Sequence, residues 1–129
     1  MSLALKTVFS SAHFYAQPRW SPEKNLETFG RCYTPHGHGH NYTLWIEFQG
    51  ESTELELAKS SLKQWMRTLV DPLEHQHLNF DVPEFSTTIP TTENIASWIW
   101  NRAQSMSSPF PILSLRLFEM DDLWVEITP

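Results

Sequence analysis

The sequence predicts one α+β domain, in which a four-stranded antiparallel sheet carries two helices on one face. Three observations support this fold class. The chain has 129 residues, which is the length of a single domain. Hydrophobic periodicity gives the order strand, strand, helix, helix, strand, strand. Short turns between consecutive strands favour antiparallel pairing, with the helices together on one side.

The first half of the chain predicts two strands and a long connection. Residues 5–14 mix β-branched and aromatic residues with polar ones, as strands do. Residues 15–35 contain three prolines and no clear periodicity, so we expect a loop, and ordered loops of this length tend to be functional. Residues 38–48 form the clearest strand, because two histidines and four apolar residues alternate onto one face. These residues are His38, His40, Tyr42, Leu44, Ile46 and Phe48.

Two helices are predicted in the middle of the chain. Residues 53–57 alternate enough for a short return strand, although Thr53 and Glu56 could instead form a capping box. Apolar residues at helical spacing predict a helix over about residues 60–70, which Pro72 prevents from continuing. A second helix follows a cap at Thr91 and Thr92. Its apolar face contains Ile95, Ile99, Ala103 and Met106.

The last two predicted strands place one acidic residue on an apolar face. Residues 112–120 alternate, and Glu119 continues the face formed by three leucines. An aspartate pair then turns the chain into a final strand over residues 123–128. A charge on an apolar face is costly unless it is paired. Glu119 could pair with Arg116, reach water at the strand end, or accept two adjacent N–H groups of a ligand.

Composition excludes several classes of protein. Nine basic residues against fifteen acidic ones give a net charge of −6, which argues against nucleic-acid binding. No segment approaches the ~20 apolar residues of a membrane span, and the N-terminus does not resemble a signal peptide. Cys32 is the only cysteine, so no intramolecular disulfide can form. We therefore expect a cytoplasmic protein.

The densest chemical signal is the run His36-Gly-His-Gly-His40. Histidines two positions apart on a strand share a face at about 6 to 7 Å, and neighbours can reach one zinc ion. The glycines leave room for a ligand or another backbone. His13 could add a third ligand, and three imidazoles with an open position are typical of catalytic zinc. Spacing does not decide which two of His36, His38 and His40 bind, and unliganded polar histidines are the alternative interpretation.

Cys32 stands between Arg31 and the histidine run, where positive charge favours the thiolate. This thiolate could be a base, a nucleophile or a zinc ligand, and we favour a base. The alternative is a small buried residue without chemistry.

Glu74 and His75 directly follow the first predicted helix. They are either surface charge at a helix end or a carboxylate that orients a proton-shuttling imidazole. His77 is given no role. Glu93, in the first turn of the second predicted helix, most simply interacts with the helix dipole.

Six short motifs then point to a family. They are, in order, Ser11-Ala12-His13, Phe29-Gly-Arg-Cys32, His38-Gly-His-Asn-Tyr42, Leu73-Glu-His75, Thr91-Thr-Glu-Asn94 and Phe118-Glu119. Together they resemble the 6-pyruvoyl-tetrahydropterin synthase family, which includes the bacterial 6-carboxytetrahydropterin synthases. The resemblance implies one pterin-synthase-like domain over residues 1–129 with the tunnelling fold. It also implies trimeric barrels that pair into homohexamers, with active sites between subunits.

The resemblance also implies a role for individual residues. It implies zinc bound by His13, His38 and His40, with His36 outside the ligand set. It makes Cys32 the catalytic base and His75 its proton-transfer partner, contributed by a neighbouring subunit. The residues implied to hold the pterin ring are Glu119, Glu93, Thr91 and Thr92.

Two departures from the family pattern are visible. Glu74 stands where the family usually has aspartate, and its extra methylene moves the carboxylate by roughly 1 to 1.5 Å. The segment between Gly50 and Ser60 is shortened. The five residues between Cys32 and His38 resemble the pyruvoyl-forming branch, whereas many carboxy-forming enzymes have three.

Together with these residues, the resemblance implies a zinc-dependent lyase. It would convert 7,8-dihydroneopterin triphosphate to a 6-substituted tetrahydropterin of the 6-pyruvoyl type and eliminate triphosphate. One alternative is 6-carboxytetrahydropterin formation with loss of acetaldehyde, on the route to queuosine. Another is a non-catalytic relative that binds zinc or pterins. The expected partners are the pterin substrate and further copies of this chain, with neither nucleic acid nor membrane.

Overall fold

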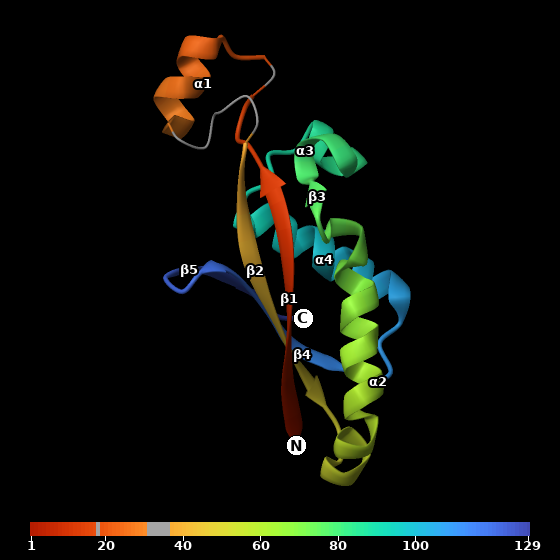
Figure 1. Ribbon diagram of the computed structural model, residues 1–129. Helices are drawn as coiled ribbons and strands as arrows, with labels where there is room; N and C mark the ends of the chain where they lie inside the picture. The colour runs from red at the N-terminus through yellow and green to blue at the C-terminus, as the bar shows by residue number, and fades with distance from the viewer. Residues whose placement is uncertain (18, 31–36) are drawn as a thin grey trace.

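The computed structural model describes residues 1–17, 19–30 and 37–129, and it contains a five-stranded sheet in the order β3-β1-β2-β4-β5 (Figure 1). The strands are β1 (Ser2–His13), β2 (His38–Gln49), β3 (Gln76–His77), β4 (Ile112–Met120) and β5 (Leu123–Ile127). The helices are α1 (Pro22–Phe29), α2 (Ser52–Val70), α3 (Leu78–Asp81) and α4 (Thr92–Met106), with 3₁₀ turns η2 (Asp71–Leu73) and η3 (Pro83–Ser86).

The predicted fold class is confirmed, with one additional strand. The four long strands pair antiparallel, as expected. The fifth, β3, has two residues and pairs in parallel with β1, where Ser11 and Ala12 face Gln76 and His77. A strand of two residues shows no periodicity, so only its contact with β1 defines it.

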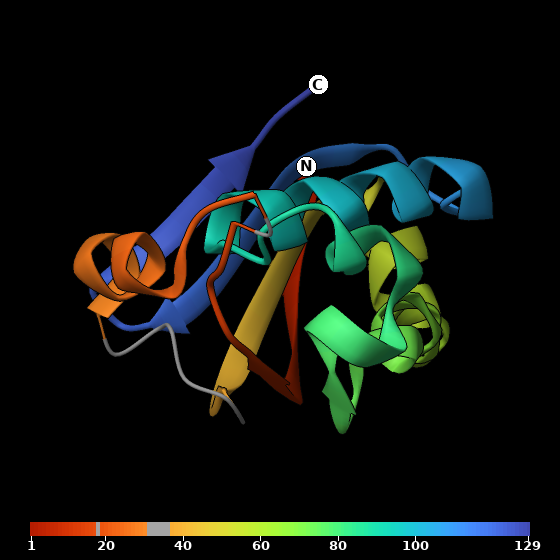
Figure 2. The same ribbon diagram turned by 90° about the horizontal axis from the view of Figure 1, so that it is seen from above.

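Helices α2 and α4 cover one face of the sheet (Figure 2). Helix α2 packs on β1, α4 packs on β4 and β5, and the two helices contact each other. The faces of β2 and β4 that point toward them alternate as predicted, and the fully buried side chains include Leu44, Ile46, Leu115 and Leu117. The described parts of the chain contain no helix long and apolar enough to cross a membrane.

The prediction of an unbroken loop over residues 15–35 is wrong, because α1 lies within it. Ser21 caps this helix by accepting a hydrogen bond from the Lys24 N–H, and proline occupies its first turn. The buried side chain of Asn25 accepts from the Gln17 N–H at 2.6 Å and donates to the Gln17 carbonyl at 3.1 Å. These contacts tie the preceding chain to the helix, which lies beyond the ends of β1 and β2 (Figure 1).

The return strand predicted over residues 53–57 is also wrong, because α2 begins at Ser52 rather than near residue 60. Glu51 caps it, and its carboxylate accepts from the Thr53 and Glu54 N–H groups at 3.1 and 3.0 Å. Leu55 already belongs to the buried face of the helix. The helix ends before Pro72, as predicted.

The β1–β2 ladder determines where the histidines meet. The register runs from Ser2 opposite Gln49 to His13 opposite His38. His40 lies two residues further along the same face of β2. One end of this two-stranded ribbon therefore carries three histidines, as the sequence predicted.

Candidate metal centre and active site

Three imidazoles converge where β1 ends and β2 begins. His13, His38 and His40 each offer one ligand nitrogen, and these nitrogens all lie within 4.8 Å of one another. The ring centroids of His13 lie 4.7 Å from those of His38 and 5.3 Å from those of His40. This cluster could hold a metal ion, and it is the set that the resemblance implied. His36 lies outside the described residues.

The environment of the cluster keeps His13 and His38 neutral, which is the form that binds metals. Burial, followed by the charges of His38, His40 and His77, lowers the pKa of His13 from 6.5 to about 3. Burial is also the main cause that lowers the pKa of His38. Nε2 of His13 is buried without a hydrogen-bond partner among the described residues. A buried nitrogen with an unused lone pair fits a metal ligand.

Gly37 allows β2 to start close to the end of β1. Its φ is +73°, and a Cβ atom there would lie 2.4 Å from the carbonyl oxygen of His13. The expectation that glycine permits a close backbone approach is confirmed at this position. Gly39 is different, because a Cβ would meet its nearest atom at an ordinary 3.6 Å.

Glu119 lies beside the histidines and is 8% exposed. Its Oε1 is 3.7 Å from Nε2 of His13 and 3.8 Å from Nε2 of His40. The Tyr42 hydroxyl donates to the same oxygen at 3.3 Å and lies 2.8 Å from Nδ1 of His13. Arg116 pairs instead with Glu126, and burial separates the Glu119 carboxylate from water, so the structure supports neither of these two alternatives for Glu119. Sequence reasoning missed Tyr42, which it counted only as an apolar member of the strand face.

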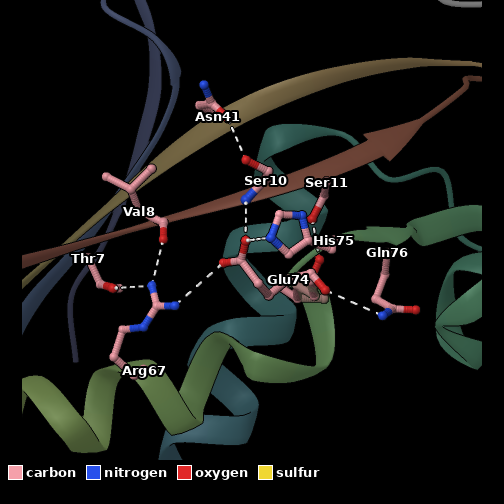
Figure 3. Close-up of polar contacts among 10 residues, drawn as sticks. Thr7, Val8, Ser10, Ser11, Asn41, Arg67, Glu74, His75 and Gln76 are labelled. Atoms are coloured by element: carbon pink, nitrogen blue, oxygen red, sulfur yellow. Dashed lines mark hydrogen bonds and ion pairs between the residues drawn. The ribbon is translucent and has the colours of Figure 1, made fainter.

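Glu74 and His75 contact each other as hypothesised, at 3.2 Å between Oε1 and Nε2 (Figure 3). The Ser10 N–H donates to Oε1 of Glu74 at 3.3 Å, and Arg67 reaches from α2 to within 3.9 Å of its Oε2. His75 has a φ of 56°, and its N–H donates to the Ser10 carbonyl at 2.7 Å. A non-glycine residue with positive φ is uncommon and often marks a functional position. The 3.2 Å contact shows that the longer Glu74 side chain still reaches the imidazole of His75.

A cavity of about 560 Å³ lies between the ends of β1 and β2 and the β3–α3 segment. His75 and the cluster member His40 both line it. Its other lining residues include Ser10, Asn41, His77 and Asp81. Both ring nitrogens of His77 are buried without a hydrogen-bond partner among the described residues. The cavity is thus bordered by one member of the histidine cluster and by the proton-shuttle candidate.

Comparison with known proteins assigns the chain to a family. The family model described as 6-pyruvoyl tetrahydropterin synthase matches residues 2–129. The chain belongs to the 6-pyruvoyl tetrahydropterin synthase family. The 6-pyruvoyl tetrahydrobiopterin synthase of Homo sapiens is 35% identical over 118 residues, covering 88% of this chain and 81% of that protein. The enzyme of the same name from Drosophila melanogaster is 35% identical over 122 residues, covering 91% and 73%.

Solved structures agree with the family assignment. The Caenorhabditis elegans 6-pyruvoyl tetrahydropterin synthase aligns with a TM-score of 0.86 and 31% identity, covering all of this chain and 95% of that one. The Plasmodium falciparum protein of the same name aligns at 0.60 with 17% identity, which supports the fold alone. The resemblance and the tunnelling fold are therefore confirmed.

The structure does not connect every predicted site residue of this family to the cluster. The Thr91 hydroxyl caps α4 by accepting from the Asn94 N–H at 3.2 Å, Thr92 is buried, and Glu93 is exposed in the first turn. Within residues 1–17, 19–30 and 37–129, no hydrogen bond or ion pair links these three to the histidines. Their role in holding the pterin remains a prediction. Cys32 lies outside the described residues.

Proposed function

We propose that the chain is a zinc-dependent lyase that converts 7,8-dihydroneopterin triphosphate to 6-pyruvoyl-tetrahydropterin with elimination of triphosphate. The observation that carries this proposal is the buried cluster of His13, His38 and His40 in a chain of this family. Relatives that it matches over most of their length carry the name 6-pyruvoyl tetrahydrobiopterin synthase. The cluster supports the metal dependence, and the names of the relatives support the reaction.

The three histidines would hold the metal. Three nitrogen donors and an open position suit zinc in a catalytic role. Bound zinc supplies a Lewis acid that polarises hydroxyl and carbonyl oxygens and so acidifies the neighbouring C–H bonds. The residues of this chain then place those bonds and handle the protons that leave them.

Cys32 and the Glu74–His75 pair would handle those protons. We assign the Cys32 thiolate as the base and His75 as the group that passes protons on. The contact with Glu74 supports this role for His75, because a carboxylate fixes the orientation of an imidazole. The His75 side chain is 81% exposed, which supports its use by the site of a neighbouring copy.

The pterin ring would be held by Glu119 together with Thr91, Thr92 and Glu93. The support for Glu119 is its buried carboxylate beside the histidines, because a carboxylate binds paired N–H groups strongly. For the three α4 residues, the support is their position at a helix N-terminus within the family motif.

We further propose that the chain acts as a cytoplasmic homohexamer, a dimer of trimers. The sheet face opposite α2 and α4 supports assembly, because it exposes apolar side chains. Val8, Trp45 and Trp124 are 43%, 36% and 46% exposed. Apolar surface of this kind is typical of interfaces. Light scattering should give the mass of six chains, and the mass of a single chain would contradict the assembly.

The activity is tested by incubating zinc-loaded protein with 7,8-dihydroneopterin triphosphate. We expect release of triphosphate and a product with the mass of 6-pyruvoyl-tetrahydropterin. A chelator should stop turnover and added zinc should restore it. Turnover that survives complete removal of zinc would contradict the metal mechanism. A product with the mass of 6-carboxytetrahydropterin, together with acetaldehyde, would move the assignment to the queuosine branch.

A single variant separates the enzyme from a non-catalytic pterin-binding relative. Cys32→Ala should keep its affinity for the pterin and lose turnover, because it removes only the proposed base. Affinity is measured by calorimetry with neopterin. Equal turnover in the variant and the parent protein would remove Cys32 from the mechanism.

A further inference from the structure

We propose that Tyr42 is a positioning residue of the metal centre. Its hydroxyl links His13 to Glu119 and selects the His13 tautomer that leaves Nε2 free for the metal. The proposal rests on the proposed function only in taking His13 as a metal ligand. It adds an outer partner for that ligand and a defined route from Glu119 to the metal.

Packing fixes the position of the Tyr42 hydroxyl. Tyr42 is fully buried on β2, two residues after His40 and on the same face. Its ring stacks on Phe9 of β1, with centroids 5.1 Å apart and planes at 12°. The hydroxyl oxygen then lies 2.8 Å from Nδ1 of His13 and 3.3 Å from Oε1 of Glu119. Three adjacent strands therefore contribute one residue each to a continuous series of hydrogen bonds.

The number of available protons determines which group donates in each of these two hydrogen bonds. An ionised carboxylate can only accept, and a hydroxyl has one proton to donate. If Tyr42 donates to Glu119, its oxygen must accept from Nδ1–H of His13. A neutral imidazole carries one proton, so Nε2 of His13 is left with a lone pair. Nε2 is the buried nitrogen that has no hydrogen-bond partner among the described residues.

This arrangement is how proteins prepare a metal-binding imidazole. A histidine ligand usually donates its other ring N–H to a carboxylate or another acceptor, which fixes its tautomer and orientation. Loss of such an outer partner typically weakens metal binding by about 10- to 100-fold. Here the acceptor is a phenol, and the carboxylate stands one step behind it. We therefore expect Tyr42 to act through His13 without touching the metal.

The test begins with Tyr42→Phe, which removes the hydroxyl and keeps the ring that stacks on Phe9. Nitrogen-15 NMR of the histidine side chains reports the tautomer in metal-free protein. Competition with a chromogenic chelator gives the zinc affinity. We expect His13 to carry its proton on Nδ1 in the parent protein and to lose that preference in the variant. Zinc affinity should fall by about 10- to 100-fold.

Thr7→Val is the matched control. It also removes a hydroxyl from the buried face of β1, but this hydroxyl accepts from Arg67, and Thr7 pairs with Leu44 away from the histidines. It should leave both the tautomer of His13 and the zinc affinity unchanged. An unchanged tautomer in Tyr42→Phe, or an equal loss of zinc affinity in Thr7→Val, would overturn the proposal.

A double-mutant cycle with Glu119→Leu tests the route, because leucine removes the acceptor of the Tyr42 hydroxyl. If Glu119 acts through Tyr42, the loss of zinc affinity from Tyr42→Phe should become small in the Glu119→Leu background. Additive losses would overturn the relay, because Glu119 would then act on the metal directly. Glu119→Leu alone allows Tyr42 to donate to Nδ1 of His13 and should shift the tautomer, so the test does not depend on one variant folding. None of these measurements uses the pterin substrate, so failure of the lyase assay and failure of the relay are distinguishable.

Discussion

The two ends of the β1–β2 ribbon share one ladder and one inward face but contain opposite chemistry. Near the start of β1, Leu5 faces Ile46, and both lie in the apolar core that α2 helps to cover. At the other end, His13 faces His38, and the ring nitrogens of the histidines converge. Burial at the first end removes apolar surface from water, which stabilises the fold. Burial at the second isolates polar atoms that need specific partners.

A single strand pairing can therefore serve stability and chemistry at once. The apolar end should tolerate other apolar side chains of similar volume, because the hydrophobic effect is not directional. The polar end depends on particular atoms, since a lone pair must point at its partner. Substitutions at the two ends should therefore separate stability from metal binding.

The largest effect is expected for His13→Ala. Loss of one of three ligands should lower zinc affinity and turnover by more than about a hundredfold, which is the upper figure for loss of a mere outer partner. Zinc content after dialysis and triphosphate release measure the two effects. His77→Ala is the control, because it removes a histidine outside the cluster, and it should retain zinc. Stoichiometric zinc in His13→Ala would show that metal binding does not require the His13 imidazole.

Ile46→Ala should produce the opposite pattern. Ile46 is fully buried, and its truncation should lower the free energy of unfolding by about 2 to 5 kcal/mol through lost burial and a cavity. Urea denaturation of the metal-free protein measures this cost. The variant should still bind one zinc per chain when folded. A small loss of stability combined with lost zinc binding would show that the two ends are not separable.

The third prediction concerns pH in the metal-free protein. His13 has a pKa of about 3 in the folded state against 6.5 in the unfolded chain, so the unfolded chain binds the extra proton between these values. The free energy of unfolding should be highest above about pH 6.5 and fall as the pH is lowered toward 3. The total loss should be on the order of a few kcal/mol. Urea midpoints measured against pH, with a chelator present, test this.

His13→Gln sharpens the pH experiment. This variant should lose much of the pH dependence, because the buried imidazole is its main source. Ile46→Ala should keep the full slope at lower overall stability. Identical slopes in His13→Gln and the parent protein would assign the effect to other groups.

The smallest effect is expected at the cap of α2. Hydrogen bonds from the Thr53 and Glu54 N–H groups lower the pKa of the exposed Glu51 carboxyl. Its stabilising contribution is present above the ordinary value of 4.5 and is lost as the pH falls through the lowered value. Glu51→Gln should therefore lower the urea midpoint slightly at pH 7 and not at low pH. A larger loss than that of Ile46→Ala would contradict this order.

The sequence predicted the parts of the fold that follow a clear period. The alternation of residues 38–48 identified both the strand and the face that carries His38 and His40. The strand prediction failed over residues 53–57, whose alternation of polar and apolar residues arises by chance within the first turns of α2. The cap at Glu51 was the missed signal, because an acidic side chain before a helical pattern can accept from its first N–H groups. Helix α1 was missed although Ser21 and Pro22 form a recognisable start.

The site was predictable as a list of ligands but not as a network. Histidine spacing and the family motifs identified the cluster that the structure brings together. The contacts of Tyr42 with His13 and Glu119 join residues distant in sequence, so no local pattern contains them. The contact of Arg67 with the Glu74 carboxylate has the same origin. Tertiary placement, not residue type, turns these side chains into partners.

Gly37 extends this conclusion to a residue that contributes no functional group. A side chain at this position would collide with the His13 carbonyl, so the pairing that unites the histidines depends on a missing atom. In a saturation library selected for zinc retention, position 37 should tolerate as few substitutions as the ligand positions. Natural selection would then conserve glycine at position 37 as strictly as the histidine ligands.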